Sequence, residues 1–319
     1  MMEAGEIAVP GAAGPSRPRL QAGSPRYGEK AIRAFLAGCA VLSIATTIAI
    51  VVSLLIPAVD FFREVPFADF FLKAEWAPAQ DLFGVVPLVV GTLNVVLWGM
   101  VVAVPVGLGA AIYLSEYASP KVRSVVKPTL EILAGVPTVA IGFFGVSLVT
   151  PLLQDIWPGT FLGGPPGFFM AGAAGICIGL MIVPIIASIS EDAMSSVPGG
   201  LREGAYALGA SRMRVSLRVV FPAALSGIVA SLVLAVSRAV GETMIVLLVA
   251  GNTPNVTLNP VENVQAMTAF IGTTATGDIA QGTIEYDTVF AVGALLFVIT
   301  LVMNLISIRF VRKYRQVYE

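Results

Sequence analysis

Residues 195–224 read SSVPGGLREGAYALGASRMRVSLRVVFPAA and separate two long apolar runs. The glycines at 199–200 open a helix, Glu203 falls in its first turn, where the helix dipole favours an acid, and Gly209 can supply a left-handed cap. A second helix is expected to start near Ser211 and to continue toward the next apolar run. The segment is therefore predicted to form a helix–turn–helix between two membrane spans.

The composition on either side of this segment is typical of a membrane protein. Of the 319 residues, 56% are hydrophobic and 12% are charged, whereas soluble domains carry about 25% charged residues. A helix needs about 20 apolar residues to cross a bilayer. Six nearly uncharged runs have this length: 34–59, 82–115, 132–154, 168–190, 219–251 and 288–308. We therefore predict an all-α integral membrane protein with six transmembrane helices, packed together because prolines in the runs need neighbouring helices to satisfy the freed carbonyls.

The basic residues indicate how the chain crosses the membrane. Sixteen of the 19 Lys and Arg residues lie in the N-terminal segment, the second and fourth loops, and the C-terminal segment. Because basic residues are retained in the cytoplasm, both termini and the loop at about 191–222 are predicted to be cytoplasmic. Residues 1–28, rich in Pro, Gly, Ala and Arg, are predicted to be a disordered cytoplasmic tail, and residues 29–319 the transmembrane domain.

The sequence lacks the residues that several classes of function require. The sequence has no histidine, which excludes a Ser-His-Asp triad and His-ligated zinc or haem. Its two cysteines lie in apolar runs, so neither a metal site nor a disulfide framework is predicted. A net charge of -1 gives no basic surface for nucleic acid. None of the five lysines follows a glycine, so the chain has no P-loop and is predicted not to hydrolyse ATP itself.

Two charged residues, Arg238 and Glu242, interrupt the fifth apolar run. An arginine at a helix centre costs about 2.5 to 3.5 kcal/mol on insertion scales, so both side chains are expected to face protein or a water-filled path. On a continuous helix they would be neighbours and could form a structural ion pair. The alternative is an anion path, in which Arg238 binds a passing oxyanion and Glu242 competes for the same guanidinium. Thr243 could donate a further hydrogen bond to the anion, or bond to its own helical turn.

The residues around Glu203 resemble the permease subunits of bacterial ABC importers. Their cytoplasmic loop carries the EAA signature: Glu-Ala-Ala, three residues, Gly, nine residues, Ile, one residue, Leu-Pro. The same spacing is occupied here by Glu203, Gly204, Ala205, Gly209, Val219, Phe221 and Pro222. The resemblance implies a type I ABC importer permease, in which this loop docks as a coupling helix into a groove on the ATPase. It also implies that Glu203, Gly204, Ala205 and Gly209 form the ATPase-coupling surface.

The flanking segments look like the permeases of the phosphate-specific (Pst) system. The resembling stretches are SEYASPKVRSVVKPTLEILAGVPTVAIGFFG at 115–145 and VSRAVGETMIVLLVAGN at 236–252, the second being closer to the PstC subunit than to PstA. The resemblance implies transport of inorganic phosphate across the bacterial cytoplasmic membrane, along a path that includes Arg238, Glu242 and Thr243. The implied partners are a PstA-type permease, two PstB-type ATPases that bind ATP and Mg, a PstS-type external phosphate-binding protein, and membrane lipid. This chain itself is expected to bind no cofactor.

Two further features allow more than one interpretation. Glu131 is predicted to lie at a cytoplasmic helix start, where an acid suits the dipole, or else to contact the partner permease or act as a gate. Residues 252–287, which contain no Lys or Arg, are predicted to be external, with one short helix at 261–271 and a place for the binding protein to dock.

Three classes of function can be compared by the sequence features that each requires. An importer permease needs a helical loop for its ATPase and depends on partners, as this sequence indicates. A secondary transporter would work as a single chain, usually with more helices or inverted repeats. A membrane enzyme would need clustered catalytic groups, and no catalytic residue is predicted. Within the first class, sulfate or molybdate is the alternative to phosphate.

Overall fold

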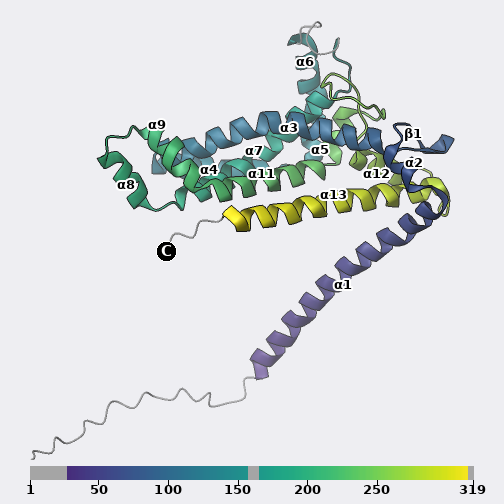
Figure 1. The fold of residues 1–319 in the computed structure, drawn as a ribbon, viewed down its shortest axis with the longest axis horizontal. Helices are drawn as coiled ribbons and strands as arrows, with labels where there is room; N and C mark the ends of the chain where they lie inside the picture. The colour runs from purple at the N-terminus through teal and green to yellow at the C-terminus, as the bar shows by residue number, and fades with distance from the viewer. Residues whose placement is uncertain (1–26, 157–164, 315–319) are drawn as a thin grey trace, which may run out of the picture. The chain divides into compact units, whose positions relative to one another are not determined.

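The structure is a computed structural model that describes residues 27–156 and 165–314. Residues 1–26 lie outside this range, so the disordered tail stays a prediction, and helix α1 (Tyr27–Glu64) begins at Tyr27. The chain divides into two units at Val51. The described part of the first unit is the beginning of α1, and the second unit is the helical bundle of Figure 1.

Long helices form the body of the second unit. They are α3 (Val86–Ile112), α7 (Ala171–Ser195), α11 (Leu225–Val240) and α13 (Ile284–Tyr314). Shorter helices connect them: α2 (Phe67–Leu72), α4 (Pro120–Ala134), α5 (Thr138–Phe144), α6 (Thr150–Ile156), α8 (Gly199–Ala207), α9 (Arg212–Val215), α10 (Phe221–Ala223) and α12 (Met267–Ala275).

Several irregular segments extend or interrupt these helices. Four are π-helical, in which each turn holds an extra residue: η2 (Tyr113–Tyr117), η3 (Gly145–Val149), η4 (Ser216–Val220) and η5 (Val246–Ala250). The 3₁₀ turn η1 (Pro78–Gln80) joins strands β1 (Trp76–Ala77) and β2 (Leu82–Phe83), which pair antiparallel with Trp76 opposite Phe83.

The predicted set of spans is confirmed. Five helical stretches are long and apolar enough to cross a membrane, and a sixth results when the helices at 212–223 and 225–240, bent by 73°, are counted as one span. The third span begins at Thr138 and not near Ile132, as the charge-free run predicted. Residues 132–134 instead end the amphipathic helix α4, and the chain breaks before Thr138 because Pro137 disfavours a helical conformation at the residue before it.

Helices α3 and α7 pack along one another at the centre of the bundle (Figure 1). Small residues permit the close approach: a Cβ added at Gly175 would lie 2.6 Å from Trp98 Cβ and 3.0 Å from the backbone nitrogen of Gly99. Close backbone packing of this kind replaces the hydrophobic driving force that lipid-embedded helices lack. Buried aliphatic residues of α3, α7, α11 and η5, such as Ile178 and Val249, complete the core.

The start of α7 is capped by a segment far along the chain. The backbone N–H groups of Met170, Ala171 and Gly172 donate to the carbonyls of Val249, Glu262 and Pro260, at 3.0, 3.0 and 2.6 Å. A helix predicted at 261–271 lies instead at Met267–Ala275. Within 261–266, the Glu262 carbonyl accepts the Ala171 N–H and the Val264 N–H donates to the Ala250 carbonyl (3.1 Å), so these groups are not used for intrahelical bonds.

Candidate functional site

The segment predicted to couple transport to ATP hydrolysis forms two short helices joined at a glycine. Gly209 has φ of 79° and donates its N–H to the Tyr206 carbonyl (2.9 Å), while Ala210 donates to the Ala205 carbonyl (3.1 Å). This pair of bonds is a Schellman motif, which satisfies the last carbonyls of α8. The predicted left-handed cap is confirmed, and so is the second helix, because α9 begins directly after Ser211.

Helix α8 presents a surface that the described residues leave uncovered. None of its residues is buried; Glu203 and Gly204 are exposed, and Ala205 is half-buried against the apolar cluster around Val215. Beside it, the Leu208 side chain is 90% exposed. The prediction that Glu203 lies in the first turn is wrong: α8 begins directly after Pro198, which places Glu203 in the second turn.

One guanidinium ties α8 to the rest of the bundle. Arg202 donates to the carbonyls of Met194 (2.7 Å) in the last turn of α7 and Val197 (2.6 Å) just after it, and twice to Glu116 Oε1, from Nε (3.2 Å) and Nη2 (3.0 Å). Glu116 lies in η2, which continues α3, and its side chain is 3% exposed. Three elements therefore meet at Arg202.

A second buried carboxylate ties α7 to α4. Glu191 is fully buried, accepts a hydrogen bond from Lys127 Nζ (2.8 Å) and from Ser195 Oγ (2.8 Å), and forms an ion pair with Arg123. Lys127 also bonds to Asp192. Burial lowers the pKa of Lys127, but the bonds to Asp192 and Glu191 outweigh it, so the pKa is raised above the ordinary value. The ammonium is therefore a fixed positive charge at the end of α7.

The fifth span is broken where an unbroken helix was predicted. Helix α11 ends at Val240, residues 241–243 are not helical, and a helix resumes at Met244. Glu242 is 4% exposed, and its Oε1 accepts the N–H groups of Met244 (3.1 Å) and Ile245 (3.3 Å), as an N-cap does. Its carbonyl accepts the buried Thr268 hydroxyl (2.7 Å). These bonds satisfy backbone and side-chain groups that the break would otherwise leave unpaired.

Of the two interpretations of Arg238 and Glu242, the structural ion pair does not agree with the structure. No salt bridge joins them, because the break at Gly241 removes the helical turn that would bring the two side chains together and because Glu242 bonds to the backbone. The Arg238 side chain is exposed and makes no hydrogen bond or ion pair with any residue that the structure describes. The two residues therefore have separate roles: Arg238 is a cation without a partner among the described residues, and Glu242 caps the following helix.

Thr243 and Glu131 are the other two residues that were assigned roles from the sequence. Their positions in the structure support those roles less strongly. Thr243 lies within the break, is half-buried, and donates to the Gly241 carbonyl at 3.4 Å. Glu131 lies in the last turn of α4 and not at a helix start, because α4 continues to Ala134. Its side chain is exposed. The dipole explanation for Glu131 is therefore wrong, since an acid is disfavoured at a helix C-terminus.

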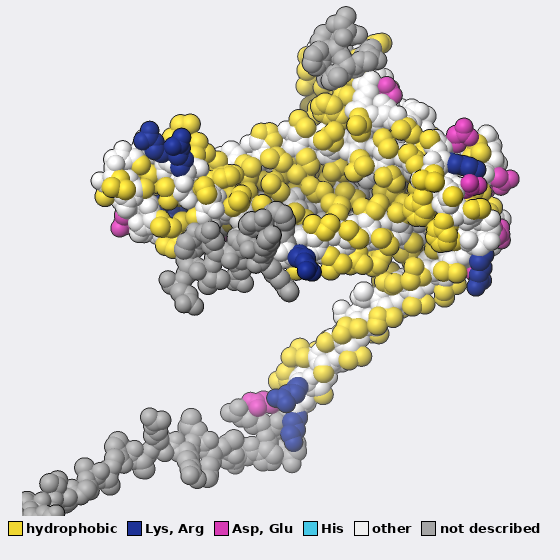
Figure 2. Space-filling view, viewed as in Figure 1, with side chains coloured by type: hydrophobic (Ala, Val, Ile, Leu, Met, Phe, Trp, Pro, Cys, Tyr) yellow, Lys and Arg dark blue, Asp and Glu magenta, His cyan; other side chains and the backbone are white. Residues whose placement is uncertain are grey.

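Charges of opposite sign lie at the two ends of the bundle. In Figure 2, dark blue side chains gather at the end formed by α8 and α9, where Arg212, Arg214 and Arg218 are exposed. Magenta side chains gather mainly at the opposite end, near α2 and β1, where Glu75 and Asp81 are exposed. An asymmetry of this kind is typical of a protein with its basic end in the cytoplasm.

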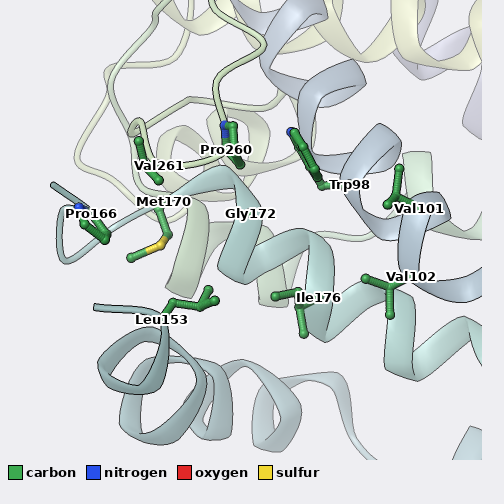
Figure 3. A pocket seen from close by; sticks show the side chains of 10 residues that line it. All are labelled: Trp98, Val101, Val102, Leu153, Pro166, Met170, Gly172, Ile176, Pro260 and Val261. Atoms are coloured by element: carbon green, nitrogen blue, oxygen red, sulfur yellow. The ribbon is translucent and has the colours of Figure 1, made fainter. Parts of the chain in front are cut away.

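A cavity of about 210 Å³ lies between α3, α7 and the end of α6 (Figure 3). Its lining is apolar: Trp98, Val101, Val102, Leu153, Pro166, Met170, Gly172, Ile176, Pro260 and Val261. The Trp98 indole N–H is already bonded to the Leu258 carbonyl (3.3 Å). The cavity thus offers no charged or free polar group to an oxyanion.

The family model for the inner membrane component of binding-protein-dependent transport systems matches residues 103–316. The chain belongs to this family. The match covers the loop at 191–222, the broken span and the last helix, so the predicted importer permease and its fold are confirmed.

Relatives of this permease agree with that assignment along most of their length. The probable ABC transporter permease protein YqgH of Bacillus subtilis is 32% identical, and the match covers 89% of this chain and 91% of the relative. The phosphate transport system permease protein PstC of Haemophilus influenzae is also 32% identical, with 84% and 88% covered.

Solved structures have the same fold at lower identity. A chain of a bacterial alginate ABC transporter superposes with a TM-score of 0.60 at 17% identity, covering 89% of this permease and 96% of that chain. A chain of the MetNI methionine ABC transporter, in an inward-facing conformation, gives 0.53 at 20% identity, with 76% and 100% covered.

Sequence reasoning missed the two buried carboxylates of this permease. Glu116 is the acid that ends the second apolar run, and Glu191 is the one that ends the fourth. An acid at the edge of an apolar run is a weak indication of burial. Their partners could not be identified from spacing, since Arg202 lies 86 residues after Glu116 and Lys127 lies 64 residues before Glu191.

Proposed function

We propose that the chain is the PstC-type subunit of an ATP-driven importer of inorganic phosphate. The observation that carries this proposal is the similarity to relatives named PstC, which extends over most of both chains. The partners would be a PstA-type permease, two PstB-type ATPases that hold ATP and Mg, and a PstS-type external binding protein. Both termini and the end formed by α8 and α9 would face the cytoplasm, in keeping with the basic residues there.

The geometry around Arg238 supports an anion path. A membrane-embedded arginine must face protein or water, and Arg238 has no partner within the described residues. Its guanidinium can therefore bond to two oxygens of a tetrahedral oxyanion. Thr243 lies in the adjacent break, where its hydroxyl can turn to an anion because its bond to Gly241 is long. Glu242 would act by shaping the break and not by competing for Arg238.

The coupling surface would be α8 with its glycine turn. Glu203, Gly204, Ala205 and Gly209 would face a groove on the ATPase, in keeping with their exposure and with the absence of buried residues in α8. Glu131, exposed near the end of α4, would contact the partner permease.

Transport by the reconstituted complex tests the substrate. We expect vesicles that contain this chain, the PstA- and PstB-type partners and the binding protein to accumulate labelled phosphate when ATP is supplied on the ATPase side. Vesicles that lack the PstA-type partner serve as the control. Uptake by this chain alone would indicate a secondary transporter. Accumulation of sulfate or molybdate in preference to phosphate, with binding proteins for each anion present, would contradict the assignment of substrate.

A further inference from the structure

Arg202 makes the main contacts between the coupling helix α8 and the rest of the bundle. Helix α8 contains no buried residue, and its half-buried Ala205 contacts neighbouring apolar side chains. Contacts between apolar surfaces are non-directional, so they resist sliding poorly. Within the described residues, Arg202 alone among the α8 side chains forms hydrogen bonds to the rest of the chain.

The contacts of Arg202 are directional and leave the side chain little freedom. Its three nitrogens make four hydrogen bonds, two to carbonyls at the end of α7 and two to the Glu116 carboxylate. Ser115 Oγ donates to the same Glu116 oxygen (3.2 Å), which fixes the acceptor as well. A planar guanidinium held at several points transmits displacement better than a flexible ammonium would.

Burial makes this link costly to break. The Glu116 side chain is 3% exposed and that of Arg202 20%. Separation of the pair would leave a carboxylate without a counter-charge in a low-dielectric region, so the pair moves as a unit. The end of α7 that includes Met194 also includes Glu191, one turn earlier, the residue that holds α4 through Lys127. A displacement of α8 can therefore reach α3, α7 and α4.

We propose that Arg202 and Glu116 form the mechanical link that carries the movement of α8 into the spans. The pair would hold the coupling helix to the ends of α3 and α7. A conformational change of the ATPase would then reorient these spans and not only tilt α8. The inference rests on the proposed function, because it requires α8 to be the surface on which the ATPase acts. In this mechanism Arg202 and Glu116 are positioning residues and do not touch the substrate.

The test separates assembly from transmission with a paired substitution. Arg202→Met alone would leave Glu116 buried without a partner and could prevent folding, so the main variant is Glu116→Met with Arg202→Met. Replacement of both partners of a buried pair by apolar residues is often neutral or stabilising. We expect this variant to assemble with its partners and hydrolyse ATP, but to carry roughly tenfold less phosphate per ATP, because several charge-assisted bonds are lost.

Lys121→Met provides the matched control. Lys121 is an exposed cation on nearby α4, and its side chain has no hydrogen bond or ion pair among the described residues. We expect its phosphate-to-ATP ratio to equal that of the wild type. A wild-type ratio in the double Met variant would overturn the proposed link. If the wild-type complex itself moved no phosphate, that result would count against the proposed function.

Hydrogen–deuterium exchange tests the link without any transport. We expect the amides of residues 199–207 to exchange several-fold faster in the double Met variant than in the wild type, because α8 loses its directional anchor. The Lys121→Met variant should show wild-type exchange in this segment. Equal exchange in all three proteins would overturn the inference whatever the transported anion is.

Discussion

At Gly209 the backbone has φ of 79°, a conformation that a side chain opposes because its Cβ approaches the following carbonyl. We predict that Gly209→Val, at a cost of about 1–2 kcal/mol, distorts the turn between α8 and α9. The spans do not contain this turn, so the chain should still insert. ATP-driven phosphate uptake by the reconstituted complex should be abolished, and normal uptake at normal expression would contradict the coupling role.

Gly282 offers a matched control for backbone strain. It has φ of 82°, and a Cβ at this position would meet no atom within 4 Å, as at Gly209. It lies between α12 and α13, away from the coupling loop. Gly282→Val should therefore carry a similar strain, and because position 282 lies in the segment predicted to dock the binding protein, any loss of uptake should be recovered at a higher concentration of that protein, unlike the loss in Gly209→Val.

Arg238 is the residue at which the anion path can be tested. Because the side chain has no partner among the described residues, Arg238→Gln should not weaken assembly with the partner subunits. Loss of a charged hydrogen-bond donor should lower phosphate uptake roughly tenfold or more. Arg238→Lys keeps the charge but not the two-pronged geometry, so we expect intermediate uptake. Uptake near the wild-type rate in the Gln variant would exclude Arg238 from the path.

Among single residues, the sequence predicts those whose role is local. The cap at Gly209 follows from its place between two helical patterns, and the structure has it there. The ion pair of Arg238 with Glu242, one of the two alternatives, does not form, because a spacing of four residues implies contact only on an unbroken helix. Gly241 ends that helix. The Arg202–Glu116 pair joins residues far apart in sequence, and spacing carries no information about such a contact.

At the scale of elements, adjacent acids at the end of α7 differ in burial and so in their contribution to stability. Glu191 is fully buried and holds two cations, whereas the Asp192 side chain is 63% exposed. We predict that Glu191→Gln destabilises the protein by about 3–5 kcal/mol, and Asp192→Asn by at most about 1 kcal/mol. Thermal unfolding in detergent would measure both. Equal shifts of Tm would show that Glu191 does not anchor α4.

The elements themselves were largely predictable. Long apolar runs have few alternatives to a membrane span, so the set of spans was predicted correctly. The predictions are wrong at places where a helix does not begin or end with the apolar run. Residues 132–134 are apolar yet end the amphipathic helix α4. The segment at 261–266 looked helical, but its Glu262 carbonyl bonds to the start of α7, a contact that no local pattern reveals.

For the whole molecule, the charge asymmetry predicts which end faces the cytoplasm. Ser211 beside α9 and Asp278 after α12 are both exposed. In a background with Cys39→Ser, since Cys39 is exposed, Ser211→Cys should react with a membrane-impermeant thiol reagent only from the cytoplasmic side. Asp278→Cys should react only from outside. The reverse accessibility would overturn the proposed orientation.

The cap on α7 has a consequence for how the protein is made. The first residues of α7 leave the ribosome well before the carbonyls of Val249, Pro260 and Glu262 that complete their hydrogen bonding. Synthesis proceeds at roughly 5–20 residues per second. The N–H groups at the start of α7 are therefore without their final acceptors for several seconds in the nascent chain. A translation arrest or truncation before residue 262 should therefore yield an inserted but immature protein, one that quality-control proteases degrade selectively.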